Sequence, residues 1–358
     1  MWFPKNGYYY YAIFSSEAPD LNFTNSKVTE EIENITKYWH DLQVNGFRMD
    51  AAPALIEEGT KQDNTGSTQS WWRDYYAFQK NYDPAFMIVG EVWEPTPVIS
   101  VYADQRMDYC YEFNLATAII DAVQNGNVNG LVAKMDEVLR SYPKLQYGTF
   151  LTNHDQTRVI EQLGRDVAKA KAAASILLSL PGVPYLYYGE EVGMRGQLPD
   201  VNVRTPMQWT DGNNAGFTNS SPWMFINSDY ATANVLTMSN DSSSLWNHYR
   251  RLIHARTGST PLTQGDYQAT TSGSDKVFSF LRAKDNEAVL AIHNLQPLQT
   301  QNVLISMASS TLAPGTYSVQ NLLSKAGEGT LVVGTAGSFS LTTTLDPFAT
   351  NLLVLKKQ

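Results

Sequence analysis

The stretch VNGFRMD at residues 44–50 is a short, mainly apolar run that ends in an arginine and an aspartate. FMIVGE (86–91) and YGTFLTNHD (147–155) have the same form, because each begins apolar and ends in polar or charged side chains. Strands that are apolar on both faces are expected where a parallel sheet is buried on both sides. These stretches therefore predict parallel strands whose carboxyl ends carry polar groups.

Helical patterns separate the predicted strands. The clearest covers residues 27–43, where apolar residues recur at spacings of three and four: Val28, Ile32, Ile35, Trp39 and Leu42. Further helices are expected at 69–82, 131–142, 166–180 and 244–256, and further strands at 106–113 and 183–189. Alternating strands and helices indicate an α/β fold with a parallel sheet. We count five strand–helix units, whereas a closed (β/α)8 barrel needs eight.

The chain changes character after residue 265. Residues 266–358 contain short alternating segments separated by Gly, Ser, Asn and Thr turns, which predicts an antiparallel β-sandwich. Residues 1–26 are aromatic and then turn-rich, and are expected to form a loop. The predicted regions are therefore 1–26, 27–265 and 266–358.

Composition excludes several classes of protein. The 358 residues include 43% hydrophobic and 17% charged residues, which is typical of a globular chain, and the net charge is −9. An acidic chain without basic clusters argues against a nucleic-acid partner and against anionic membranes. No apolar stretch approaches the roughly 20 residues that span a bilayer, and residues 1–14 lack the features of a signal peptide. The single cysteine, Cys110, excludes a disulfide framework, and the scattered histidines predict neither a metal nor another cofactor.

Asp50 and Glu91 form a candidate acid–base pair. Arg48 lies two residues before Asp50, so a strand places both side chains on one face, where the guanidinium would lower the pKa of the Asp50 carboxyl. The apolar residues before Glu91, with Trp93 after it, would raise the pKa of the Glu91 carboxyl. One ionised and one protonated carboxyl are what glycoside hydrolysis requires. The alternative is an ordinary ion pair at a strand end.

The third polar strand end carries Asn153, His154 and Asp155. Neutral histidine and ionised aspartate can bind the hydroxyls of a sugar ring, and such bonds strengthen as positive charge develops on the ring. The alternatives are a helix-capping aspartate and a buried histidine with satisfied hydrogen bonds.

These three motifs resemble those of the α-amylase family. GFRMD (46–50), VGEVW (89–93) and FLTNHD (150–155) are similar to the motifs of its fourth, fifth and seventh barrel strands. The resemblance implies that Asp50 is the nucleophile, that Glu91 is the acid/base and that Asp155 stabilises the transition state. It implies a substrate-binding set made up of Arg48, His154, Trp93 and Arg158.

Other segments extend the resemblance over the chain. PDLN (19–22) is similar to a motif near the end of the family's inserted domain. RTPMQW (204–209), with NAGF (214–217), resembles the segment after the eighth strand in oligo-1,6-glucosidases, α-glucosidases and intermediate α-amylases. The implied fold is a partial (β/α)8 barrel of strands four to eight, between a remnant of the inserted domain and a C-terminal sandwich.

The resemblance implies retaining hydrolysis of α-1,4-glucosidic bonds in starch or malto-oligosaccharides. Ala51, just after the nucleophile, favours α-1,4 over α-1,6 bonds, and Pro53 and Ala54 replace a Lys-His pair that serves substrate and calcium in many members. An α-glucosidase, an oligo-1,6-glucosidase, a trehalose-forming isomerase and an inactive glucan-binding remnant stay open as alternatives.

The start of the chain departs from the family pattern. Nothing before Asp20 matches the first three strands, so we expect a barrel truncated at its N-terminal side. A homo-oligomer or a complementing N-terminal chain would then supply the missing wall. The resemblance favours secretion or the periplasm for full-length relatives, whereas the residues themselves leave the compartment undetermined.

Overall fold

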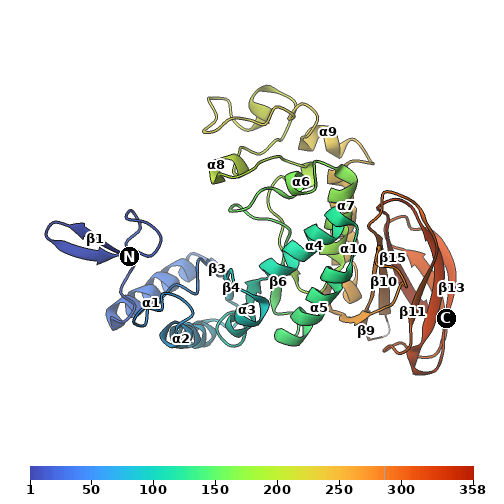
Figure 1. Ribbon diagram of the computed structural model, residues 1–358, viewed down its shortest axis with the longest axis horizontal. Coiled ribbons are helices and arrows are strands. Elements are labelled where there is room, and N and C mark those ends of the chain that lie inside the picture. Colours follow the sequence, from blue (N-terminus) through green and yellow to red (C-terminus); the bar gives the residue numbers. More distant parts are fainter. Residues whose placement is uncertain (286) are drawn as a thin grey trace. The chain divides into compact units, whose positions relative to one another are not determined.

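The computed structural model describes residues 1–285 and 287–358, which form two compact units (Figure 1). The first unit comprises Met1–Glu112 and Leu139–Gly148. The second comprises Phe113–Val138 and Thr149–Gln358.

A β-hairpin begins the first unit, where the sequence predicted a loop. Strands β1 (Trp2–Lys5) and β2 (Tyr8–Tyr11) pair antiparallel. Asn6 and Gly7 join them with φ angles of 52° and 80°. Positive φ at both central residues is the signature of a type I′ turn, whose twist matches that of the strands it connects. The loop prediction for these residues was therefore wrong, because an Asn-Gly pair between aromatic residues favours a hairpin.

Helix α1 (Ser26–Asp41) confirms the predicted helix. The Asn25 side chain caps it by accepting a hydrogen bond from the Lys27 backbone N–H. Its apolar face, however, is largely open to solvent: Ile35 and Trp39 are each 44% exposed, and Leu42 is 56% exposed. Of the five apolar residues that predicted the helix, Ile35, Trp39 and Leu42 are therefore exposed, whereas Val28 and Ile32 are half-buried.

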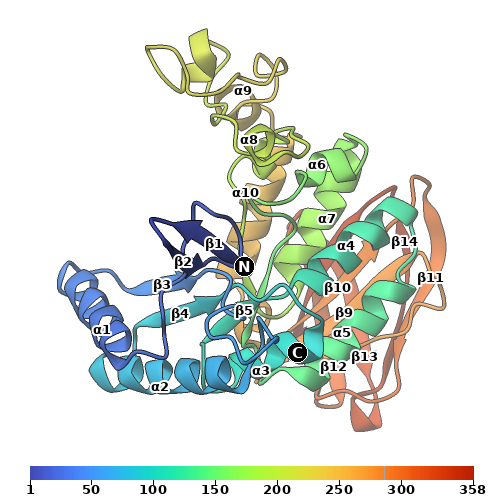
Figure 2. The same cartoon turned by 60° about the vertical axis from the view of Figure 1, so that its left-hand side comes forward.

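Five parallel strands follow one another in sequence order, as the succession of strand–helix units predicted. They are β3 (Gly46–Met49), β4 (Met87–Gly90), β5 (Tyr109–Tyr111), β6 (Tyr147–Thr149) and β7 (Val183–Pro184). Figure 2 shows β3, β4 and β5 side by side. Cys110 lies in β5 and is fully buried, and burial raises the pKa of its thiol. Strand β7 is shorter than the predicted 183–189 stretch.

Helices connect and follow these strands. The longer ones are α2 (Gly66–Tyr82), α3 (Thr96–Ala103), α4 (Phe113–Asn125), α5 (Asn129–Ser141), α7 (Val167–Ser179) and α10 (Leu245–Thr257). The shorter ones are α6 (Val159–Gln162), α8 (Asp200–Val203), α9 (Val235–Ser239) and α11 (Thr260–Gln264). The predicted helices correspond to α2, α5, α7 and α10, whereas α3 and α4 were not predicted. Among residues 1–285 and 287–358, no helix has the length and apolar character that crossing a bilayer requires.

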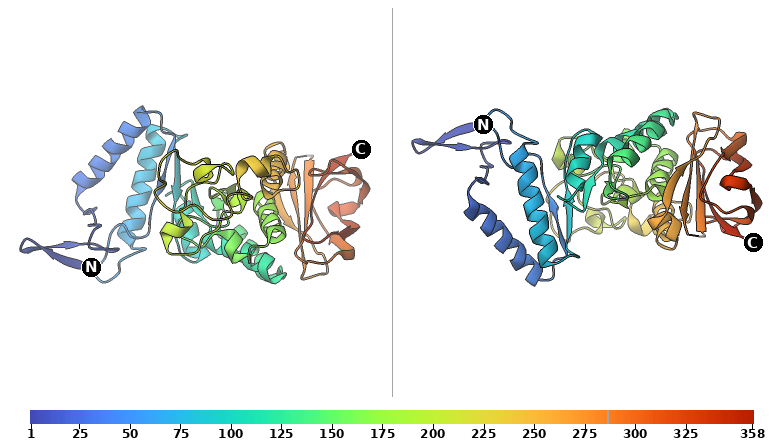
Figure 3. Two further views of the ribbon diagram at one scale, coloured as in Figure 1. Left: turned by 90° about the horizontal axis from the view of Figure 1, so that it is seen from above. Right: turned by 90° about the horizontal axis from the view of Figure 1, so that it is seen from below.

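The C-terminal part forms two antiparallel sheets (Figure 3). One sheet has the strand order β13-β12-β15-β10-β9-β8, and the other pairs β11 with β14. Their bounds are β8 Asp266–Ala269, β9 Val277–Lys284, β10 Glu287–Asn294, β11 Thr300–Met307, β12 Gly315–Asn321, β13 Gly327–Val333, β14 Phe339–Leu345 and β15 Thr350–Lys357. Buried residues from both sheets, including Leu290, Ile305 and Phe339, form one apolar cluster. The predicted antiparallel β-structure is confirmed.

Buried polar contacts connect these sheets to α7 within the second unit. The fully buried Arg282 on β9 donates one hydrogen bond to the Ser179 carbonyl (2.9 Å) and two to the Gly265 carbonyl (3.1 and 2.9 Å). The His293 Nε2 atom lies 3.1 Å from the Ser179 hydroxyl. The second unit therefore includes residues on both sides of position 265, and the domain boundary predicted there stays a prediction.

Candidate active site

In the first unit, the Arg48 guanidinium joins two carboxyl groups. Its Nη1 donates to Asp50 Oδ1, and its Nη2 lies 2.9 Å from Glu91 Oε2. Parallel pairing aligns Arg48 with Val89, so the ends of β3 and β4 bring these residues to the same edge of the sheet. The Asp50 side chain is 73% exposed and the Glu91 side chain only 12%. Two carboxyls from neighbouring strands therefore share one cation but differ in their access to water.

Backbone contacts fix the position of Glu91. Its N–H donates to the Met49 carbonyl (2.8 Å), and its Oε2 accepts from the Ala51 N–H (3.1 Å). Ala51 has a φ of 40°, so the chain turns directly after Asp50. Burial raises the pKa of the Glu91 carboxyl, the Ala51 and Arg48 interactions oppose that rise, and contact with Asp50 adds to it. A raised pKa keeps the proton that a general acid must deliver.

Two aromatic residues belong to this region. Trp93, two residues after Glu91, is 55% exposed and could stack on a sugar ring. Tyr111 ends β5, and burial raises the pKa of its hydroxyl, which also lies within electrostatic range of Arg48 and Glu91. The sequence analysis did not identify Tyr111, although its position at the end of the next strand was a usable signal.

In the second unit, Asp155 lies in the loop after β6. Its N–H donates to Asn153 Oδ1 (2.9 Å), and its Oδ2 lies 3.2 Å from His154 Nε2. Its Oδ1 accepts from Arg204 Nη2 at 2.5 Å. The Asp155 side chain is 29% exposed and that of His154 40%. The structure thus brings His154 and Asp155 together with both side chains partly open to solvent.

Arg204 is a site residue to which the sequence analysis gave no function. Besides Asp155, it contacts the His154 carbonyl through Nε (2.9 Å) and Asp200 Oδ2 through Nη2 (2.8 Å). It is the first residue of the RTPMQW segment and lies 49 positions after Asp155. One side chain therefore contacts both the carboxylate of the predicted transition-state residue and the backbone carbonyl of the residue before it.

Arg158 has contacts unlike those expected of a substrate-binding residue. It is 1% exposed, and it donates to the Val203 carbonyl (2.9 Å) and the Tyr188 carbonyl (2.7 Å). Its guanidinium also lies over the Tyr187 and Tyr188 rings, 4.5 and 4.7 Å from their centroids. Carbonyls and rings surround most of the charge, and these contacts favour a role in stabilising the loops around Val203 and Tyr188, while the predicted substrate-binding role stays a prediction.

The predicted catalytic and substrate-binding residues are divided between the two units. Arg48, Asp50, Glu91 and Trp93 belong to the first unit, and His154, Asp155 and Arg158 to the second. Within the part of the chain that the structure describes, no three His, Cys, Asp or Glu side chains gather as a metal site would require. The roles of the two groups, and their action together, therefore stay predictions.

Comparison with known proteins identifies the family. The profile of the α-amylase catalytic domain matches residues 1–265. The chain belongs to the α-amylase family. It is 32% identical to Alpha-amylase 3 of Dictyoglomus thermophilum, covering 84% of this chain and 59% of that protein. It is 28% identical to the oligo-1,6-glucosidase of Parageobacillus thermoglucosidasius, covering 80% of this chain and 63% of that protein.

A solved structure of the α-amylase family agrees with this assignment. The α-amylase from H. orenii superposes with a TM-score of 0.81 at 32% identity, covering 99% of this chain and 70% of that one. The chain spans about three fifths of the length of the two curated relatives above. The family predicted from the three strand-end motifs is confirmed.

Proposed function

We propose that this chain carries the catalytic residues of a retaining glycosidase that cleaves α-1,4-glucosidic bonds in starch or malto-oligosaccharides. The observation that carries the proposal is the Arg48 side chain shared by Asp50 and Glu91. It holds an exposed carboxyl close to a buried one with a raised pKa. That is the pair of environments that a nucleophile and a general acid need.

The proposed reaction has two steps. Glu91, protonated, gives its proton to the glycosidic oxygen while Asp50 attacks the anomeric carbon, forming a covalent glycosyl–enzyme and releasing the shortened glucan. Glu91, now ionised, then removes a proton from water, and that water releases the sugar from Asp50 with net retention. We assign Asp155 and His154 to the ring hydroxyls, where hydrogen bonds strengthen as charge develops on the sugar.

The preference for α-1,4 bonds rests on Ala51 and on the α-amylase relatives. The oligo-1,6-glucosidase relative makes an α-1,6 preference the second candidate. Because the chain spans only part of these relatives, its activity as it stands belongs to the proposal. We also infer that β3 to β7 correspond to strands four to eight of a (β/α)8 barrel, and that residues 266–358 form a separate C-terminal domain.

Reducing-sugar release from soluble starch, maltose and isomaltose, measured in parallel, tests the proposal. We expect starch to be the preferred substrate, with the α-anomer as the first product by NMR. Asp50→Asn, Glu91→Gln and Asp155→Asn should each lower kcat by at least about 10³-fold, because the loss of one residue of a catalytic unit removes most of the rate enhancement of the whole unit. Asp104→Asn, which changes an exposed carboxylate of the first unit, serves as the control.

Three results would count against this function. A β-anomer as first product would exclude a covalent Asp50 intermediate. A preference for isomaltose would favour the oligo-1,6-glucosidase alternative. Full activity in Glu91→Gln would remove Glu91 from the mechanism.

A further inference from the structure

A cavity of about 540 Å³ lies in the first unit, at the base of the β1–β2 hairpin. Its wall includes Trp2 and Tyr11 from the hairpin, Asp20 and Asn22 from the segment that follows, and Glu57 and Gln62 from the loop between β3 and α2. This volume falls in the range of roughly 300–1,000 Å³ that small-molecule sites occupy. None of these side chains has a part in the mechanism proposed above.

The aromatic part of the wall is formed by a cross-strand pair. Trp2 and Tyr11 are register partners, and their rings lie 5.5 Å apart, edge to face at 65°. Trp2 is 66% exposed. An edge-to-face pair keeps one ring in a fixed orientation, so an exposed tryptophan in such a pair offers a flat apolar surface to a ligand.

The rest of the wall is polar. Asp20 accepts a hydrogen bond from the Ile13 N–H (3.1 Å), and Gln62 Nε2 donates to the Tyr11 hydroxyl (3.2 Å), so both side chains are held in place. The carboxylates of Asp20 and Glu57 can accept from hydroxyl groups and disfavour an anionic ligand. A flat apolar face bordered by hydroxyl groups is the surface that a sugar ring presents to such a wall.

The cavity is connected to the catalytic carboxyls through one loop. Glu57 and Gln62 belong to the segment that starts at Asp50 and ends at the N-terminus of α2. That segment is tied down at Ile56, whose N–H donates to Thr68 Oγ1 (2.9 Å) and whose carbonyl accepts from Thr65 Oγ1 (2.5 Å). A ligand in the cavity would therefore contact the same loop that begins at the proposed nucleophile.

We propose that this cavity is a binding subsite for a glucosyl residue of a long α-glucan, separate from the residues that are cleaved. The inference rests on the proposed function, because it assumes that the polymer reaching Asp50 is a glucan. Trp2 stacks on the sugar ring, and Asp20 and Glu57 accept hydrogen bonds from its hydroxyls. Substrates too short to reach the cavity gain nothing from it.

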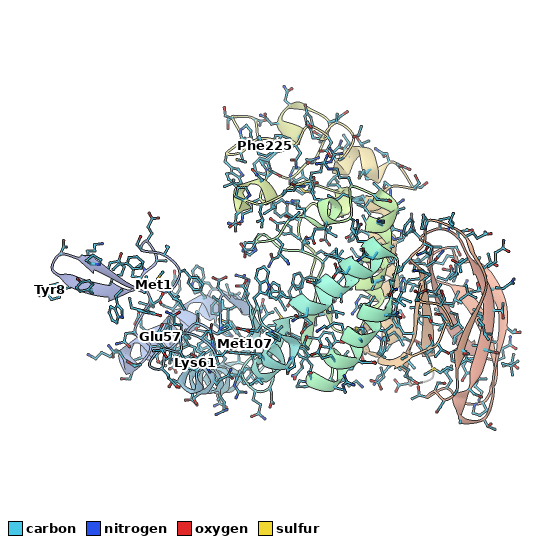
Figure 4. All side chains as sticks on the ribbon, viewed as in Figure 1. Met1, Tyr8, Glu57, Lys61, Met107 and Phe225 are labelled. Atoms are coloured by element: carbon cyan, nitrogen blue, oxygen red, sulfur yellow. The ribbon has the colours of Figure 1, made fainter. Side chains whose placement is uncertain are left out.

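Affinity electrophoresis in gels containing soluble starch tests binding without requiring catalysis. We expect starch to retard the wild-type chain and the Trp2→Ala variant to bind about tenfold more weakly, with Trp2→Phe restoring part of the retardation. Glu57→Gln, which leaves the hairpin unchanged, should also weaken binding. Tyr8→Ala is the matched control, since Tyr8 is an exposed aromatic residue at the hairpin tip, far from Met1 in Figure 4.

Kinetics provide the second measurement. In Trp2→Ala we expect a higher KM for starch, with kcat/KM for maltotriose unchanged. If starch retards Trp2→Ala and Glu57→Gln as much as the wild type, the subsite is overturned while the proposed function stays intact. The same holds if Tyr8→Ala loses as much retardation as Trp2→Ala. If the wild type hydrolyses no glucan but its retardation depends on Trp2, the proposed function fails and the subsite is supported.

Discussion

At the scale of single residues, two arginines organise carboxylates in the separate units. Arg48 serves Asp50 and Glu91, and Arg204 serves Asp155. The Arg48 pairing could be predicted because a strand places residues 48 and 50 on one face. The Arg204 pairing could not, because 49 residues separate it from Asp155 and only the folded loops bring them together.

Arg204 is therefore expected to act as a positioning residue. Arg204→Ala removes the contacts to Asp155 and to the His154 carbonyl, and we expect kcat to fall by roughly 10²-fold with a smaller change in KM, since a small displacement near the reacting centre has that cost. Arg204→Lys should recover part of the loss. Arg195→Ala, which breaks a pair with Asp229, is the control. Steady-state kinetics in which KM alone changes would point to substrate binding instead.

Glu190 makes stability depend on pH. Burial raises the pKa of its carboxyl to about 8 from the ordinary 4.5, and the Tyr249 hydroxyl donates to it at 3.2 Å. The folded state binds this proton more tightly than the unfolded state, so the stabilisation is present below pH 4.5 and is lost as the pH rises to about 8. The full difference is roughly 5 kcal/mol as an upper bound.

Urea unfolding at pH 5, 6.5 and 8 measures this effect. We expect the free energy of unfolding of the wild type to decrease across this range and that of Glu190→Gln to decrease less, because glutamine keeps the shape and carries no titrating proton. Asp211→Asn, at an exposed carboxylate, should follow the wild type. Parallel curves for wild type and Glu190→Gln would show that Glu190 is charged when folded.

At the scale of elements, sequence patterns predicted most of the long helices. Helices α1, α2, α5, α7 and α10 lie within a few residues of the predicted ranges because their apolar spacing and end residues are local signals. Helix α4 was missed although Leu115, Ile119 and Val123 have helical spacing, because the predicted strand at 106–113 overlapped its start. Strand β7 ends at Pro184, and Tyr187 and Tyr188 instead pack against Arg158, a contact that no local pattern encodes.

The connection between α7 and β9 should make these elements unfold together. Arg282→Ala removes hydrogen bonds to the Ser179 and Gly265 carbonyls from a fully buried position. We expect the free energy of unfolding to fall by about 3 kcal/mol or more, because buried acceptors lose a charged donor. Hydrogen exchange should then show faster exchange in both α7 and β9. Arg250→Ala, on the outer face of α10, is the control, and a change confined to β9 would contradict the coupling.

At the scale of the whole molecule, the uncovered face of α1 predicts self-association. Ile35, Tyr38, Trp39 and Leu42 are all at least 44% exposed, and β3 is the end strand of the parallel sheet. An apolar helix face and an open strand edge both favour association with another chain. We propose a second copy as the partner, with a complementing N-terminal chain as the alternative.

Size-exclusion chromatography with light scattering measures this directly. We expect the wild type to have a mass above the 40.0 kDa of one chain. Trp39→Glu should shift the population towards the 40.0 kDa monomer. Glu30→Gln, on an exposed position of the same helix, should leave it unchanged. A wild-type monomer with full activity on malto-oligosaccharides would show that the exposed face needs no cover.

The fully buried thiol in β5 allows the local opening of the first unit to be measured. Cys110 is the only cysteine in the chain, so a thiol reagent can label one position alone. Because the sulfur is inaccessible while the strands are paired, the labelling rate reports how often β5 opens to solvent. A bound glucan that stabilises the first unit would slow the labelling of Cys110, and low stability of the first unit would make the labelling faster. The labelling rate thus measures the opening of the first unit independently of the opening of the second unit.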